Sequence, residues 1–123
     1  MAFLNDRVFD NGLTVLDTEA NSVHVTSAEA TTYTEAITTY TLGSSSSLSI
    51  AAPTDRVGGG RKVTVASIAD GSITGTGTVT HYALVDTTNS RLLATAALTA
   101  SQSVTNGNTF TLATFDIGIP DPT

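Results

Sequence analysis

Two histidines are the side chains best suited to acid–base or metal chemistry in this sequence. His24 lies in "SVHVTS" and His81 lies in "VTHYALVD", so each belongs to a pattern typical of a strand. A metal site needs His, Asp or Glu at defined spacings, and neither histidine has such a residue two or four positions further on. Asp17 or Asp86 could approach in three dimensions, but a histidine on the surface of a sheet is the simpler interpretation.

A hydrolase would need one of these histidines beside a nucleophilic serine. The run "GSSSS" at 43–47 does not match the G-x-S-x-G turn that exposes such a serine, so the sequence disfavours an enzyme. Glycoside hydrolysis would need two carboxylates in one cleft, whereas most acids here adjoin turn residues, where Asp caps its own backbone. These acids are Asp10, Asp55, Asp70, Asp86 and Asp121. A single Ca²⁺ held by turn carboxylates is left open as an alternative, but we expect no catalytic residue, metal or cofactor.

A glycine cluster next to cations, "VGGGRK" at 57–62, has a composition suited to phosphate binding. A phosphate-binding loop reads G-x-x-x-x-G-K-[ST] and begins a helix, whereas here Val63 follows Lys62 and a strand pattern begins. Arg56, Arg61 and Lys62 nevertheless place three of the five cations within seven residues of an acidic chain. They form either a solvated loop or a contact patch for an acidic surface, where arginine donates directional hydrogen bonds to carboxylates.

The elements that position these residues are built from a composition rich in hydroxyl groups. Thr and Ser account for 24 and 12 of the 123 residues, while hydrophobic residues make up 40% and aromatic residues 6%. Threonine favours strands because its branched Cβ suits a pleated surface. The chain is long enough for one domain, and a core without Trp gives a modest hydrophobic driving force. An oligomer or a partner that buries more surface would therefore stabilise it.

Charge and special segments narrow the classes of function further. A net charge of −6 with only five Lys and Arg residues disfavours a nucleic-acid partner, which needs a cationic face. The lack of cysteine excludes disulfides and thiolate metal sites. No signal peptide is visible, because the first residues have charges at Asp6 and Arg7 and no apolar region. No apolar run approaches the 18 residues of a membrane span, so we expect no membrane partner.

Short strands separated by turn residues dominate the pattern. Residues 1–12 are interpreted as an N-terminal arm that ends in the turn "DNG". Strands are expected at 13–17, 22–27, 47–51, 61–69 and 73–86, with a turn at 70–72. Residues 31–41 are ambiguous: Thr32 and Glu35 fit a capping box, yet the density of threonine argues against a long helix. One helical turn and an extended segment both remain possible there.

Two hairpins are expected in the second half of the chain. The strands 79–85 and 92–98 flank the turn "TTNS", in which Asn89 tolerates a left-handed conformation. Alternation gives the first of these strands one face made of Val79, His81, Ala83 and Val85. The second hairpin joins "SQSVT" to "NTFTLATFDIGI" around Asn106-Gly107, a strong hairpin signal. The tail "PDPT" cannot extend a sheet, because proline lacks the backbone donor.

Seven or eight short strands with frequent turns, and no alternation of strands with helices, indicate an all-β fold. The expected architecture is a single antiparallel β-sandwich or small barrel. The predicted organisation is an N-terminal arm at 1–12 followed by a β-sandwich domain at 13–123, which ends in a short proline-containing tail.

Three phrases, "FDNGLTVLDTEAN", "HYALVDTTNSRLLAT" and "VTNGNTFTLATFDIGIPDP", resemble a group of small Thr/Ser-rich structural proteins of tailed-bacteriophage virions. The resemblance runs from about Phe9 to Pro122 and rests on composition and short segments of sequence, without a catalytic signature. It implies a non-enzymatic β-domain that is made in the host cytoplasm and assembles on a virion. Within that class the chain is most similar to a capsid decoration, or cement, protein, which binds the outer head surface and braces neighbouring capsid subunits.

This resemblance implies two kinds of partner, the major capsid protein and further copies of the same chain, possibly as a trimer. The contact regions expected under it are the arm and the cationic loop, namely Phe3, Leu4, Val8, Phe9, Arg56, Arg61 and Lys62. Exposed apolar residues in an arm usually mean docking, and a disordered terminus is the other interpretation. In contrast to some decoration proteins, the chain shows only this short arm and no long N-terminal extension.

A tail-fibre, head-fibre or baseplate module that binds a host glycan or connects appendage parts is the alternative function. A sugar site favours exposed aromatic rings, and the tyrosines available are Tyr33, Tyr40 and Tyr82. Tyr33 and Tyr40 lie seven residues apart in a repeated "TTYT". They could stack on a ligand or pack within the protein.

Overall fold

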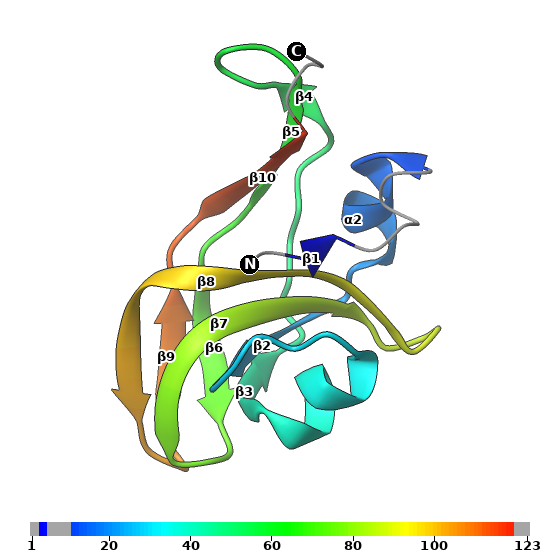
Figure 1. Cartoon of the computed structure of the whole chain (residues 1–123). Helices are drawn as coiled ribbons and strands as arrows, with labels where there is room; N and C mark the ends of the chain where they lie inside the picture. The colour runs from blue at the N-terminus through cyan, green and yellow to red at the C-terminus, as the bar shows by residue number, and fades with distance from the viewer. Residues whose placement is uncertain (1–2, 5–10, 120–123) are drawn as a thin grey trace.

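The chain folds into two antiparallel β-sheets, which confirms the prediction of an all-β antiparallel fold. The computed structural model describes residues 3–4 and 11–119. In spatial order the larger sheet contains β1 (Phe3–Leu4), β8 (Arg91–Val104), β7 (Gly77–Asp86), β2 (Ser22–Thr26), β3 (Thr41–Ser45), β6 (Ile68–Ile73) and β9 (Thr109–Leu112). The smaller sheet contains β10 (Phe115–Ile119), β5 (Arg61–Val65) and β4 (Thr54–Asp55). Figure 1 shows that the larger sheet curls into a half-barrel and that the smaller one extends away from it.

Two strands of each sheet belong to one continuous ribbon. β5 leads into β6 across residues 66–67, and β9 leads into β10 across residues 113–114. The pair β6/β9 and the pair β5/β10 therefore follow one another along the same two segments of chain. At the corner between them, the Thr114 hydroxyl donates to the Val65 carbonyl oxygen over 2.7 Å. The smaller sheet is thus the far end of a ribbon that leaves the half-barrel.

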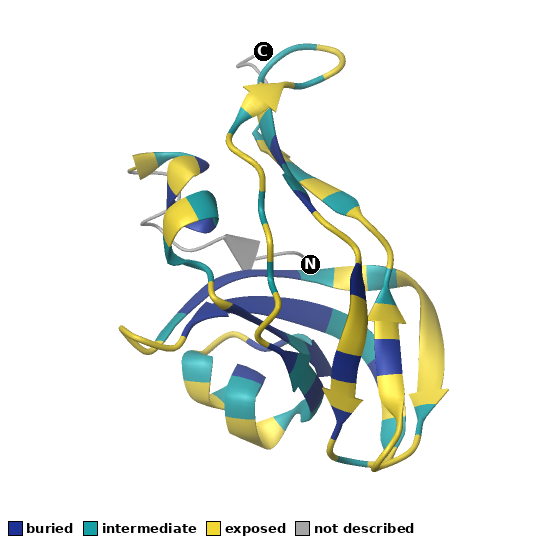
Figure 2. Cartoon of the chain, turned by 180° about the vertical axis from the view of Figure 1, so that it is seen from behind, coloured by how far each residue is buried: buried dark blue, intermediate teal, exposed yellow. Residues whose placement is uncertain are grey.

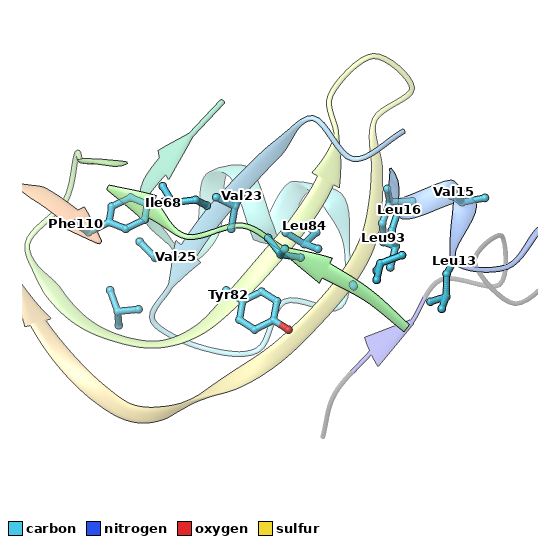
Figure 3. Close-up of a cluster of buried hydrophobic side chains, with 14 of the residues drawn as sticks. Leu13, Val15, Leu16, Val23, Val25, Ile68, Tyr82, Leu84, Leu93 and Phe110 are labelled. Atoms are coloured by element: carbon cyan, nitrogen blue, oxygen red, sulfur yellow. The ribbon is translucent and has the colours of Figure 1, made fainter. Parts of the chain in front are cut away.

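The main core fills the inner face of the curled sheet. Figure 3 shows Tyr82 and Leu84 of β7 in its middle, with Phe110 towards one end and the helix α2 (Thr14–Glu19) at the other. α2 contributes Leu16, which is fully buried. The predicted strand at 13–17 is therefore wrong. Its apolar residues Leu13, Leu16 and Ala20 recur three and four positions apart, which is the period of a helix and not of a strand.

The outer face of the same sheet is covered by a second, smaller cluster. Ala83 and Val85 of β7 and Leu92 of β8 pack there with Ala30 and Ala36. The covering segment contains a single π-helical turn, η1 (Glu35–Thr39). Both faces of the central strands are thus buried, so a chain with few large side chains obtains two apolar layers from one sheet.

The π-helical turn is closed at its start by the hydroxyl residues that precede it. The Glu35 N–H donates to the Thr32 hydroxyl over 3.1 Å. The Glu35 carboxylate accepts from the Thr31 N–H and hydroxyl at 2.9 and 2.8 Å. The helical alternative for residues 31–41 is therefore the observed one, and the second bond of the expected capping box goes to Thr31 instead of Thr32.

Two bulges in the β7–β8 pair change which side chains face inward. The register shifts between Val79 and His81 and again between Leu84 and Val85. Val79 consequently lies in the inner core with Leu84, while Ala83 and Val85 belong to the outer cluster. The prediction that Val79 shares a face with Ala83 and Val85 is wrong, because the first shift interrupts the alternation along β7. The second shift has its extra residue, Leu93, on β8, so Ala83 and Val85 still share a face.

Three boundaries predicted from turn residues also differ from the structure. Residues 47–51 form an irregular segment with one isolated bridge, whereas the serine-rich residues just before them belong to β3. Residues 70–72, predicted as a turn, lie within β6. The predicted long strands 61–69 and 73–86 are each broken, and the second begins at Gly77. Ser, Thr and Asp take part in this sheet as readily as apolar residues do. Residues that are typical of turns therefore do not mark the ends of these strands.

The first predicted hairpin is confirmed, and the second is wrong in its pairing. β7 and β8 pair around the turn 87–90, where Ser90 and not Asn89 has a positive φ, of 55°. The turn at Asn106-Gly107 also forms, with a φ of 94° at Gly107. β9, however, pairs with β6 and not with β8. Two strands joined by a tight turn therefore separate from each other.

The packing of Phe110 on Gly71 gives a test of this arrangement. Gly71 lies opposite Phe110, and a Cβ at Gly71 would overlap the aromatic ring, whereas a Cβ at Gly75 would meet the Leu42 side chain at an ordinary 3.4 Å. We predict that Gly71→Ala lowers the free energy of unfolding by about 1–3 kcal/mol through overpacking. The control Gly75→Ala should change it by less than about 0.5 kcal/mol. Urea denaturation would measure both, and equal stabilities would contradict the close packing at Gly71.

Candidate interaction surfaces

The two histidines lie on neighbouring strands but are held by threonines. His81 of β7 is opposite Thr26 of β2, and His24 is opposite Ala83. The His24 Nδ1 lies 2.9 Å from the Thr41 hydroxyl oxygen, and burial lowers the pKa of His24.

His81 has a similar partner, because its Nδ1 lies 2.8 Å from the Thr80 hydroxyl oxygen. Its Nε2 is 4.0 Å from a carboxylate oxygen of Glu29. A Ser-His-Asp arrangement needs a serine at one ring nitrogen. In residues 11–119 the hydrogen-bond partners of both rings are threonines instead.

Asp86, which could have approached a histidine, holds the turn between β7 and β8. Its Oδ1 accepts from the N–H groups of Thr88 and Asn89 at 3.0 and 3.3 Å, and its Oδ2 accepts from the Asn89 side-chain amide at 2.8 Å. Burial acts to raise the pKa of this carboxyl, but the hydrogen bonds from Asn89 and Thr88, with the charge of Arg91, outweigh it and lower the pKa. The buried Asp86 carboxylate therefore holds the turn between β7 and β8 in place.

The serine-rich run surrounds Asp70 and makes a polar hollow. The Ser47 hydroxyl donates to Asp70 Oδ2 at 2.9 Å, and the Ser45 hydroxyl donates to Oδ1 at 3.3 Å. The hollow has a volume of about 300 Å³ and is lined by Ser22, Ser44, Ser45, Ser46, Ser47, Asp70 and Ser72. Asp70 is the one carboxylate in this lining. Across the described residues no three His, Asp or Glu side chains come together as a metal site would need.

Two of the three cations predicted as contacts are already paired with acids on the ribbon. Arg61 donates to Asp55 Oδ1 at 2.5 Å, and Lys62 donates to Asp116 Oδ2 at 3.0 Å. Hydrogen bonds from Thr64 and Lys62 lower the pKa of Asp116. These pairs are exposed, so each contributes little stability. They nevertheless leave less positive charge for an acidic partner than the sequence suggests.

The loop at the tip of the ribbon exposes Val57 and leaves Arg56 half-buried. The Arg56 guanidinium donates to the Gly59 carbonyl oxygen over 3.0 Å, and within the described residues it has no ion pair. Val57 is 91% exposed. Gly58, Gly59 and Gly60 all have positive φ values, which side chains with a Cβ rarely adopt. The predicted cationic contact region therefore also contains an exposed apolar side chain, Val57.

The other predicted contact region is described in part. Phe3–Leu4 forms β1, which pairs with Thr95 and Ala94 of β8. Val8 and Phe9 lie outside the described residues, as does the proline-containing tail at 120–123.

The tyrosines pack within the protein. Tyr82 is buried, its ring lies 4.5 Å from that of Phe115, and burial raises its pKa to about 12. Tyr33 and Tyr40 pack against the outer cluster. Tyr82 is therefore not exposed for stacking on a sugar.

Sequence reasoning missed an apolar groove between β8 and β9. The groove has a volume of about 250 Å³ and is lined by residues between Leu98 and Val104, by residues 110–113, and by Val25 and Val79. It exists because the two strands of the expected second hairpin separate. Figure 2 shows that this half of β8 is exposed, in contrast to its buried first half. The signal for the groove in the sequence is a long uncharged run of Thr, Ser and Ala, and such a run fits paired strands equally well.

Comparison of the chain with protein-family models, with curated proteins and with solved structures gave no match. Among the described residues, none of the helices has the length and apolar character needed to cross a membrane.

The Asp86 carboxylate gives a pH-dependent prediction. Because its pKa is lowered in the folded protein, it stabilises the fold above the ordinary carboxyl pKa, and this stabilisation is lost as the pH falls through the lowered value. Asp86→Asn should therefore cost about 1–3 kcal/mol at pH 7 and less at pH 3, which lies below the ordinary carboxyl pKa. Urea unfolding of both proteins at the two pH values would measure this. An equal cost at both would mean that the charge does not stabilise the turn.

Proposed function

We propose that this chain is a non-enzymatic virion structural protein that binds the outer surface of a bacteriophage capsid and stabilises contacts between capsid subunits. The proposal is supported first by the three phrases that resemble small Thr/Ser-rich virion proteins. Its partners are the major capsid protein and further copies of the chain. The all-β fold is compatible with this role but is shared by proteins of many functions, so the argument depends on the surfaces.

The observation that carries the proposal is that the side chains suited to chemistry are used to hold the fold. His24 contacts Thr41, Asp70 accepts from two serines, and Asp86 binds its own turn. What the described surface offers instead is contact area. One region is the ribbon tip, with the exposed Val57 beside the half-buried Arg56, and the other is the groove between β8 and β9.

These two regions lie in separate parts of the molecule. The tip is at the far end of the ribbon, at the top of Figure 1, whereas β9 and the second half of β8 lie at the lower left of the half-barrel. A protein with two separated contact regions can touch two neighbouring subunits at once. A modest affinity at each contact is then sufficient, because two contacts linked in one molecule bind more tightly together than either does alone.

A fibre or baseplate module that binds a host glycan is the second candidate, and the hollow around Asp70 favours it. Serine hydroxyls and a carboxylate are suited to hydrogen bonding with a hydroxyl-rich ligand. The tyrosines do not reinforce it, since Tyr82 is buried. Host polysaccharide that binds the protein and is released by Asp70→Asn would support this candidate, and an unchanged affinity in that variant would exclude this hollow as the glycan site.

The number of copies of this chain in purified virions would test the proposal directly. Quantitative mass spectrometry against the major capsid protein is expected to give a number close to that of capsomers or capsid subunits. A few copies per particle would contradict decoration of the head and favour a tail or fibre component. Absence from virions would contradict both candidates.

The ribbon tip gives a prediction for attachment. Arg56→Ala should reduce the number of copies per virion about tenfold or more, if the guanidinium bonds to capsid carboxylates, while Arg56→Lys, which keeps the charge, should retain most of them. In residues 11–119 the Arg56 guanidinium donates to the Gly59 carbonyl oxygen and to no carboxylate, so both variants should fold, which circular dichroism would verify. A full complement of copies with Arg56→Ala would show that the tip is not a contact region.

A further inference from the structure

The groove between β8 and β9 has two unpaired strand edges as its rims. β8 has β7 on one side, and on its other side β1 pairs only with Ala94 and Thr95. Among the strands that the structure describes, β9 is the last of the larger sheet and has β6 as its one neighbour. Within the described residues, both rims therefore present backbone N–H and C=O groups that no second strand covers. Such an edge is a template for the addition of a further strand.

Neither rim carries charge or proline, which commonly protect an edge strand. Residues 92–115 form a continuous stretch of 24 residues without Asp, Glu, Lys, Arg or Pro, in a chain with a net charge of −6. Natural edge strands are guarded by charges, prolines or bulges. A bulge near Val79 bends β8, and the uncharged edges continue beyond it. Edges of this kind suit a surface that a partner covers.

The chemistry of the groove specifies what that partner presents. Val25, Val79 and Phe110 are buried beneath it, and Leu98 and Leu112 add to its apolar lining. An extended polypeptide segment satisfies both features, because its alternate side chains enter the groove while its backbone bonds to a rim. A small apolar molecule would leave the rims unpaired. A charged segment would lose its hydration without gaining an ionic partner.

We propose that this groove binds an extended, uncharged segment of another polypeptide by strand addition, with apolar side chains at every second position of the segment. The mode of binding has a precedent within the chain, because Phe3–Leu4 already extends the same edge of β8 in antiparallel register. The assignment of the segment to a subunit of the capsid shell rests on the proposed function. The groove is then one of the two contacts through which the chain grips the capsid.

Hydrogen exchange of the free protein and of purified virions tests this assignment. Within residues 98–104 and 109–112, the amide groups that point to the groove are expected to exchange about tenfold or more slowly on the virion, because they gain backbone hydrogen bonds. The turn 87–90 lies outside the groove and serves as the internal reference, with an unchanged rate. This measurement uses the unmodified protein, so it does not depend on the folding of any variant.

Thr111 is the position at which strand addition can be blocked with least damage to the fold. Ile73 donates to the Asn108 carbonyl oxygen over 2.8 Å, and Phe110 is paired with Gly71. Phe110 and Leu112 on either side of Thr111 both have partners on β6, with the extra residue of the register shift on β6. Because backbone donors alternate in direction along a strand, we infer that the N–H of Thr111 points to the free rim. Thr111→Pro removes this donor at a position where an edge strand tolerates proline. Thr111→Val keeps the N–H and is the matched control.

Thr111→Pro is expected to reduce the copies bound per virion by about tenfold or more, and Thr111→Val by less than about twofold. Thermal unfolding of the two free variants establishes that both are folded. Normal binding of folded Thr111→Pro would overturn the proposal.

The outcomes separate this inference from the proposed function. Virions that contain the chain but show unchanged exchange at both rims would overturn strand addition and leave decoration intact. Rims already protected in the free protein, together with the mass of a dimer or trimer, would overturn the assignment to the shell and make a second copy the occupant. Absence of the chain from virions would overturn the proposed function and, with it, the shell as the source of the segment.

Discussion

The scarcity of large apolar side chains constrains the whole molecule. A core without tryptophan has to be assembled mainly from Val, Leu, Ile and Ala, and each Å² of buried apolar area contributes only about 25 cal/mol. The chain responds by burying both faces of its central strands, so that residues 82–86 of β7 are all buried. α2 covers the inner face at one end, and the segment around η1 covers the outer face. These two short helical elements are therefore as necessary to the sheet as its strands are.

The fold class could be predicted from the sequence because it depends on composition and turn frequency, which are local. Pairing could not be predicted in the same way. Asn106-Gly107 forms its turn as expected, but β9 joins β6, since the chain after β9 must continue into β10 beside β5. The helix at Thr14–Glu19 was hidden by its own short length, because six residues fit a strand pattern almost as well as a helical one. The bulges in the β7–β8 pair leave no signal in a run of Val, Leu and Ala.

The candidate site illustrates the same limit at the level of side chains. The sequence identified the cationic loop correctly as a cluster, but it could not show that the neighbouring Asp55 and the distant Asp116 would pair with Arg61 and Lys62. Asp116 lies 54 positions from Lys62 along the chain and reaches it only through the β5–β10 register. The histidines were correctly placed in strands, whereas their threonine partners depend on neighbouring strands and rotamers. The groove forms because β8 and β9 do not pair with each other. The residue pattern of either strand alone does not show whether the two will pair.

The ribbon and the groove have a common structural cause. The turn after β8 is bonded to the turn after β6, with Gly107 N–H donating to the Ile73 carbonyl oxygen at 2.9 Å and Asn106 N–H to the Thr76 hydroxyl at 3.0 Å. This contact holds β8 and β9 together at one end of the half-barrel. Beyond it, β9 is drawn towards β6 because the same chain continues into the ribbon. β6 and β9 both lead into the ribbon at the corner near Thr114, so the projecting tip and the open edge of β9 are formed by the same segments of chain.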